Sequence, residues 1–382
     1  RTQDGGAALM RRFAWQSVLA LLLCLAGATM LPLADAVTAL PFTIARTGAI
    51  ELLLLGSVVV TMSGVNRLGG AVLLLFTVHI AAFMLLGGIA GNEGAARPSF
   101  FCLLAAAWLL AWRLNVVLSR LKLENRGERS LQRLAIPALF GVWILILWEG
   151  ITRGAGIPFV LLPPPTAIAA RFASSLPILG ADLVQTVFKA VLAGYVIGCG
   201  SGFVVAILAD RVPFLRKGML PIGNLVSALP IIGIAPIMVM WFGFDWQSKA
   251  AVVVVMTFFP MLVNTVAGLA ASGHMERDLM RTYASSYWQT LFKLRLPAAA
   301  PFIFNALKIN STLALIGAIV AEFFGTPIVG MGFRISTEVG RMNIDMVWAE
   351  IAVAAVAGSV FYGVVAFVER AVTFWHPSIR GG

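Results

Sequence analysis

Few side chains in this sequence are of a type and spacing that supports catalysis. His79, His274 and His376 stand alone, without the second histidine and the glutamate that a zinc-protease helix places within one turn. No Gly-Lys dipeptide occurs, so the phosphate-binding loop that ends in Gly-Lys-Ser/Thr is missing. We therefore expect no enzyme here: no catalytic residues, no cofactor and no metal site.

The segment that could act on another protein is Asp278–Pro297, a polar and basic stretch between two long apolar runs. A helix starting at about Arg281 would be two-sided, with polar residues on one stripe and Tyr283, Tyr287 and Leu291 on another. Trp288 would widen the apolar side, and aromatic side chains often anchor interfaces. Leu296-Pro297 should end this helix, because proline cannot continue a hydrogen-bonded helix but fits the first turn of the next one.

This segment resembles the cytoplasmic signature loop of bacterial ABC-importer permeases. The family pattern is Glu-Ala-Ala, three residues, Gly, nine residues, Ile, one residue, Leu-Pro. Here Asp278-Leu279-Met280 stands for Glu-Ala-Ala, Ala284 for Gly, Leu294 for Ile, and Leu296-Pro297 for Leu-Pro. Similar text runs from Leu161-Leu162-Pro163-Pro164-Pro165-Thr166 to Val320-Ala321-Glu322-Phe323-Phe324. Residues 134–376 look like the nitrate, sulfonate, taurine and pyrimidine-precursor branch of these permeases.

The resemblance implies partners as well as a site. Two separate ATPase subunits, which bind ATP and Mg, would sit on the cytoplasmic face, a second permease copy would complete a homodimer, and an external or periplasmic binding protein would deliver the solute. The ATPase-coupling residues would be Asp278, Arg281, Tyr283, Ala284, Ser285, Tyr287, Trp288, Leu291, Leu296 and Pro297. ATP-driven closure of the ATPases would then switch the permease between inward- and outward-facing states.

The composition predicts an all-α, polytopic membrane protein. Of 382 residues, 60% are hydrophobic and only 12% are charged, about half the charged share of soluble proteins. Its +11 net charge is scattered over short loops rather than gathered in a patch, which argues for membrane lipid and against nucleic acid as a partner. Apolar runs predict ten spans, near residues 13–33, 48–65, 70–90, 99–117, 134–152, 186–208, 219–242, 249–270, 299–323 and 347–369.

Lysine and arginine positions predict the orientation. With both termini in the cytoplasm, Arg11, Arg12, Arg67, Arg380 and the Asp278–Pro297 segment all lie inside. Residues 1–112 would form a four-span extension, and residues 113–133 a basic, amphipathic linker on the inner membrane surface. Residues 134–382 would form a six-span permease domain of the type I kind, with its coupling loop at 274–297.

Four residues inside predicted spans are candidates for the translocation pathway: Ser227, Pro230, Asn310 and Glu322. For Glu322, a structural tie to the backbone of the Gly325–Gly332 turn competes with gating or substrate contact. Lys308 lies about 21 Å from Glu322 along a straight helix, too far for a direct pair, and we expect a snorkelling or paired structural role for it rather than substrate contact. We expect His79 to make a hydrogen bond between helices.

Three functions fit the sequence, with the permease subunit of an ATP-driven importer of a small polar or anionic solute favoured by the resemblance. An ion-coupled secondary transporter would need several intramembrane acids and inverted repeats, yet Glu322 stands nearly alone. A non-transporting membrane scaffold would place its active part in residues 1–112. Deleting those residues separates the alternatives, because retained ATP-dependent uptake would make them regulatory or assembly elements.

Overall fold

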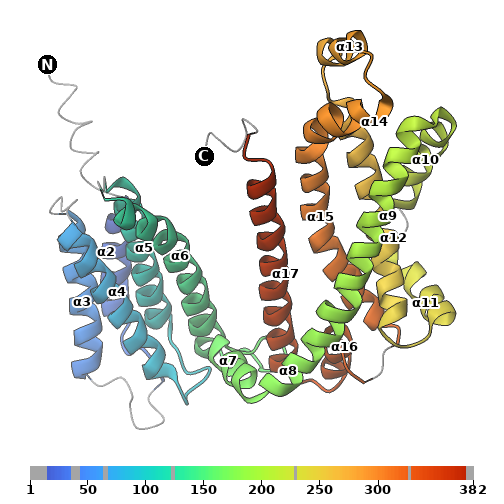
Figure 1. Ribbon diagram of the computed structural model, residues 1–382. Coiled ribbons are helices and arrows are strands. Elements are labelled where there is room, and N and C mark those ends of the chain that lie inside the picture. Colours follow the sequence, from blue (N-terminus) through green and yellow to red (C-terminus); the bar gives the residue numbers. More distant parts are fainter. Residues whose placement is uncertain are drawn as a thin grey trace, which may run out of the picture. The chain divides into compact units, whose positions relative to one another are not determined.

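The computed structural model describes residues 15–35, 44–62, 68–121, 125–227, 230–325 and 328–375, and these are almost entirely helical (Figure 1). Within these ranges, eight helices are long and apolar enough to cross a membrane, and Trp15–Thr29 and Ile231–Phe242 are shorter apolar helices. The chain is therefore an all-α, polytopic membrane protein, as predicted. Some residues that the sequence analysis names lie outside the described residues: Arg11, Arg12, Arg67, His376 and Arg380.

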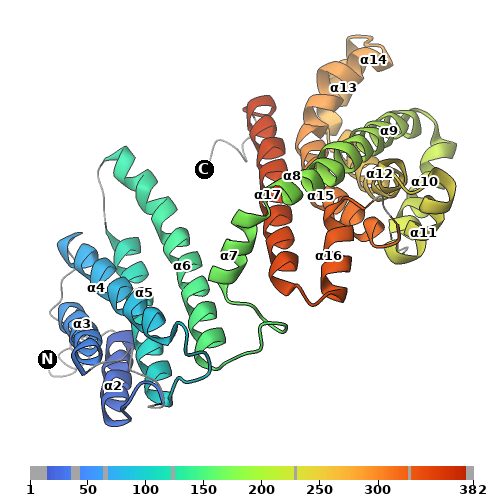
Figure 2. The ribbon, with the colours of Figure 1, turned by 90° about the horizontal axis from the view of Figure 1, so that it is seen from below.

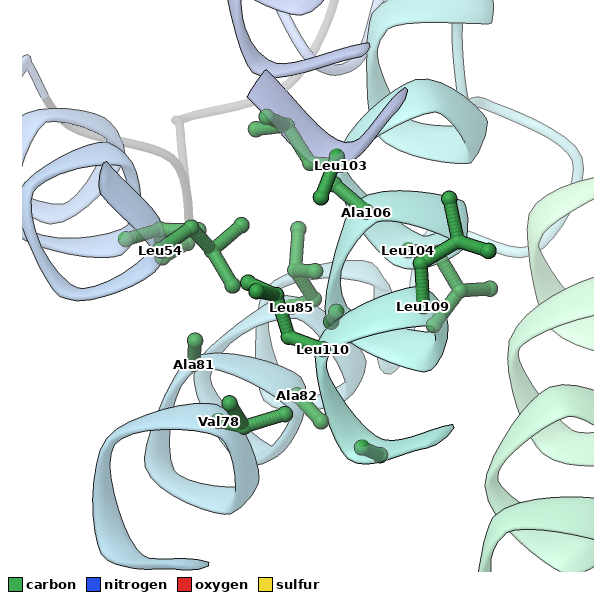
Figure 3. Packing of buried hydrophobic residues seen from close by; sticks show 14 of the residues in the cluster. Leu54, Val78, Ala81, Ala82, Leu85, Leu103, Leu104, Ala106, Leu109 and Leu110 are labelled. Carbon is green, nitrogen blue, oxygen red and sulfur yellow. The ribbon is translucent and has the colours of Figure 1, made fainter. Parts of the chain in front are cut away.

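The chain divides into two compact units, Arg1–Ala169 and Ala170–Gly382. The first contains α2 (Trp15–Thr29), α3 (Ile44–Met62), α4 (Leu68–Ile89), α5 (Pro98–Arg120) and α6 (Arg126–Gly154). Its core gathers leucines, valines and alanines around α5, with Leu54, Leu85, Leu103 and Leu110 fully buried (Figure 3). Burying these side chains on one face of each helix holds the bundle together.

Helix α6 packs within the first unit. The Trp143 Nε1–H donates to His79 Nε2 at 3.1 Å, and His79 Nδ1 lies 2.6 Å from the Leu75 carbonyl oxygen. His79 is thus the interhelical contact that the sequence predicted. Near the start of α6, the Gln132 side chain donates to the carbonyl oxygens of Leu118 and Leu121 at the end of α5.

The predicted linker at residues 113–133 is largely helical. Its residues form the last turns of α5 and the first turns of α6, and residues 122–124 lie outside the described part. The boundary between the two compact units falls after residue 169. By its contacts, α6 therefore belongs to the first unit, although it was predicted to open the permease domain. The functional boundaries at 112 and 134 stay predictions.

The second unit is built on three closely packed helices (Figure 2). They are α9 (Leu192–Arg211), α12 (Trp246–Ala270) and α15 (Leu296–Glu322). Gly194, Gly198 and Gly202 face α12 every fourth residue, and a Cβ on Gly198 would lie 2.0 Å from the Thr257 hydroxyl oxygen. Glycine at these positions is what lets the two backbones approach.

The remaining helices complete the second unit. Helix α7 (Pro165–Ser174) leads in from the first unit, and α8 (Leu176–Leu183) runs through a π-helical stretch, η1 (Val184–Val191), into α9. Helix α16 (Met331–Gly340) and α17 (Ile344–Val372) follow α15.

One predicted span is interrupted. The stretch 219–242 is divided between α10 (Pro213–Ser227) and α11 (Ile231–Phe242). Pro230 is the N-cap of α11, and it has no amide hydrogen and disfavours helix in the residue before it, which explains the break. The stretch is therefore not one continuous helix among the described residues, and its role as a single span stays a prediction.

Candidate coupling site

The polar segment folds into two short helices at one end of the second unit, opposite α16 (Figure 1). Helix α13 spans His274–Thr282 and α14 spans Tyr287–Thr290. Arg277 fixes α13 to the preceding helix, because its guanidinium donates to the carbonyl oxygens of Ala270 at 2.8 Å and Ser272 at 3.0 Å. These carbonyls lie at the C-terminal end of α12, where a cation also complements the helix dipole.

Helix α13 ends in a Schellman motif. The Ser285 N–H donates to the Met280 carbonyl at 3.0 Å, and the Ala284 N–H donates to the Arg281 carbonyl at 2.9 Å. Ala284 has a φ of 53°, the left-handed conformation that this motif requires and that glycine adopts without a Cβ penalty. This residue stands where the signature pattern has its glycine, so the fold gives a physical reason for that glycine.

The predicted continuous helix from Arg281 through Leu291 is therefore wrong. The left-handed Ala284 stops α13, and the Ser286 side chain starts α14 by accepting from the Gln289 N–H at 3.3 Å. Gln289 Oε1 in turn accepts from the Ser286 N–H at 2.8 Å, which completes a capping box.

The predicted end at Leu296-Pro297 is also wrong. Helix α14 continues through a π-helical stretch, η2 (Leu291–Arg295), directly into α15. Pro297 sits in the first turn of α15, and the wide π turn before it leaves no regular ladder for its missing amide hydrogen to break.

A buried ion pair anchors α14 and η2 to α9. Two Arg295 nitrogens donate to the two Asp210 carboxylate oxygens at 2.6 and 2.7 Å, and the Tyr287 hydroxyl donates to Asp210 Oδ2 at 3.1 Å. Arg295 Nε also donates to the Leu269 carbonyl at 3.0 Å. The Arg211 guanidinium lies 5.5 Å from the centre of the Tyr287 ring and 5.9 Å from that of Trp288. These contacts join α9, α12 and α15 at one point.

An exposed apolar stripe runs along α13 to its C-cap, Tyr283, and Trp288 and Phe292 farther along the chain are exposed as well. Met275 is 85% exposed, Leu279 55% and Tyr283 76%, and the three are four residues apart, so they form one stripe. Asp278 and Arg281 form an ion pair of 3.3 Å beside the stripe, with both side chains in solvent. Trp288 is half exposed, whereas Leu291 is fully buried between α12 and α15. An exposed apolar stripe thus also lies earlier in the chain than the predicted Tyr287–Trp288 surface, and the surface that contacts the ATPase stays a prediction.

The predicted pathway residues whose side chains the structure describes, Pro230, Asn310 and Glu322, make separate sets of contacts. Ser227 ends α10, its side chain lying outside the described part, and Pro230 is exposed at the start of α11. Asn310 is fully buried, and its Nδ2 donates to the Thr257 carbonyl oxygen at 2.8 Å, which ties α15 to α12.

Glu322 lies in a buried polar network at the other end of α15. Its carboxylate accepts from the Thr186 hydroxyl at 2.8 Å and from the Gly332 N–H at 2.7 Å. The second bond is the tie to the turn that the sequence suggested. Lys308 pairs with Glu369 of α17 at 2.8 Å, so it does find a separate partner.

The same network contains charged residues that sequence reasoning missed. Asp182 of α8 accepts from the Gly330 N–H at 2.6 Å and from Arg334 Nε at 2.8 Å. Glu350 of α17 is fully buried close to the Asp182 carboxylate and the Arg334 guanidinium. The network holds α8, α15 and α16 together.

Comparison with known proteins decides the family. Residues 194–374 match the model for the "binding-protein-dependent transport system inner membrane component". The formylaminopyrimidine transport permease protein of Halalkalibacterium halodurans is 31% identical over 252 residues, which cover 65% of this chain and 98% of that protein. The chain belongs to this permease family. It is the permease subunit of an ABC importer, a multi-pass inner-membrane component, and this outcome favours the first of the three functions over the secondary transporter and the scaffold.

Two further relatives have other names. The riboflavin transport system permease protein of Chloroflexus aurantiacus is 27% identical over 256 residues, covering 65% of this permease and 95% of the relative. A putative aliphatic sulfonates transport permease protein of Bacillus subtilis is 27% identical over 252 residues, covering 65% and 88%. Relatives of this permease therefore carry names of chemically different solutes.

Proposed function

We propose that α13 is the contact through which separate ATPase subunits drive this permease. The observation that carries the proposal is the exposed stripe of Met275, Leu279 and Tyr283 on a short helix that projects from the packed spans. An apolar stripe of this kind suits a groove on another protein. ATP would be bound and hydrolysed on those subunits, with Mg, and not on this chain.

The anchor explains how movement of α13 would reach the spans. Arg277 ties α13 to α12, and Arg295 and Tyr287 tie α14 to Asp210 of α9. Displacement of α13 would therefore move three packed helices together rather than bend one loop. Energy would enter as the difference in ATPase affinity between the two permease conformations.

The rest of the assembly is part of the proposal. The permease would act as a homodimer, receive solute from an external binding protein, and keep both termini and α13 in the cytoplasm. Its solute would be small and polar or anionic, in line with relatives named for sulfonates, taurine, bicarbonate and a pyrimidine. Identifying the ligand that the cognate binding protein holds tests the solute class.

The coupling proposal is tested with Leu279→Asp in the assembled importer. A charge in the middle of the stripe should abolish co-purification of the ATPase and ATP-dependent uptake without preventing membrane insertion. Met342→Asp is the control, because Met342 is equally exposed, at 60%, and lies between α16 and α17. Normal ATPase binding and uptake by Leu279→Asp would refute the proposal. Tyr287 is a poorer test, because its hydroxyl bonds to Asp210 within the permease.

A further inference from the structure

An apolar groove lies between α5 and α6, inside the first unit, and the transport function does not account for it. Its volume is about 570 Å³, within the range of about 300–1,000 Å³ typical of sites for small organic ligands. Four of its ten lining residues are aromatic: Trp108, Trp112, Phe140 and Trp143. The groove is therefore shaped for an elongated apolar group.

The groove becomes polar toward one end. Along α5 the lining changes from Trp108 and Trp112 to Asn115 and Ser119. The Asn115 side-chain oxygen is buried and has no hydrogen-bond partner among the described residues, so it is an acceptor without a donor.

Cations continue the polar end of the groove on both helices. Arg120 follows the lining residue Val116 by four positions, and Arg133 precedes the lining residue Pro137 by four. Four residues are about one helical turn, so each arginine lies one turn beyond the groove on the same side of its helix. Both arginines are exposed. The order along the groove is thus apolar wall, amide acceptor, then positive charge.

We propose that this groove binds one anionic phospholipid. An acyl chain lies along Trp108, Trp112 and Trp143, and the phosphate lies between Arg120 and Arg133. A headgroup hydroxyl, such as the glycerol hydroxyl of phosphatidylglycerol, donates to Asn115. A membrane protein is surrounded by phospholipids, and arginines near the membrane surface attract anionic headgroups. A lipid held between α5 and α6 would brace their contact.

Native mass spectrometry of the delipidated full-length permease, titrated with phosphatidylglycerol, tests the proposal. We expect one saturable lipid per chain, bound at least tenfold more tightly than phosphatidylcholine. Arg120→Gln with Arg133→Gln should weaken binding about fivefold for each charge removed. Val116→Trp should fill the groove and abolish tight binding while leaving both arginines in place.

Matched variants control for charge and bulk. Arg216→Gln with Lys217→Gln removes the same charge from exposed positions on α10, and Val72→Trp adds the same bulk to an exposed position on α4. Neither should change phosphatidylglycerol affinity. Equal affinity for phosphatidylcholine, unchanged binding in Val116→Trp, or equal losses in the control variants would overturn the proposal. Full competition by free glycerol phosphate would also overturn it, because the acyl chain would then contribute nothing. If Val116→Trp does not fold, the arginine pair and its control decide.

Discussion

Ala284→Gly should stabilise the end of α13. Ala284 occupies the left-handed position of the Schellman motif, with a φ of 53°. An L-residue pays about 1–2 kcal/mol for that conformation. Glycine avoids this cost but loses about 0.5–1 kcal/mol more chain entropy on folding. The net expectation is that the turn becomes more stable by about 0.5–1 kcal/mol.

Hydrogen exchange measures this change locally. The Ser285 amide, which bonds to the Met280 carbonyl, reports opening of the motif. A gain of about 0.5–1 kcal/mol should slow its exchange about two- to fivefold. Ala284→Val should act in the opposite direction, because a β-branched side chain is a poorer fit to a positive φ.

Ala271→Gly is the matched control. Ala271 is the C-cap of α12 and has a φ of −75°, an ordinary right-handed conformation. Glycine there relieves no backbone strain, so hydrogen exchange of the amides at the end of α12 should be unchanged or faster. Ala284→Gly should not behave like this control. If it speeds exchange of the Ser285 amide as much as Ala271→Gly speeds exchange at the end of α12, the explanation of the signature glycine by backbone conformation is wrong.

Three further changes test a buried ion pair, the close packing of two helices and a helix N-cap. Arg295→Ala should destabilise the permease by about 3–5 kcal/mol in thermal unfolding, because Asp210 is left buried without its charge partner, and the double alanine variant should cost less than the sum of the single variants. Gly198→Ala should prevent close packing of α9 on α12 and lower the melting temperature, whereas Gly200→Ala, which has open space, should not; equal effects would contradict the packing argument. The pKa of Asp245 is held below its usual value by hydrogen bonds from Gln185 and the Trp246 N–H. Asp245→Ala should remove an N-cap worth about 1 kcal/mol at neutral pH, and the difference from the native chain should vanish as the pH falls through that lowered pKa; a difference that persists in acid would refute the cap.

Composition and periodicity predicted the all-α membrane fold because both are local properties of the sequence. The long apolar runs became helices, and the isolated His79 became an interhelical contact. The signature pattern pointed to the permease family, which the comparisons confirm, because its spacing is preserved although several residue types differ. These features required no knowledge of which helices pack together.

The errors arose where tertiary or backbone geometry decides. Helical spacing through Ala284 gave no warning of its left-handed conformation, because alanine is the strongest helix former. The Asp210–Arg295 and Asp182–Arg334 pairs join residues 85 and 152 positions apart, so a single sequence offered no signal for them.

Photo-crosslinking from position 279 in the assembled importer tests the central claim most directly. A benzophenone side chain in place of Leu279 should form an adduct with the ATPase subunit, and one in place of Met342 should not. An adduct only with lipid or with the external binding protein, or ATPase adducts of equal yield from both positions, would contradict the assignment of α13 as the coupling helix.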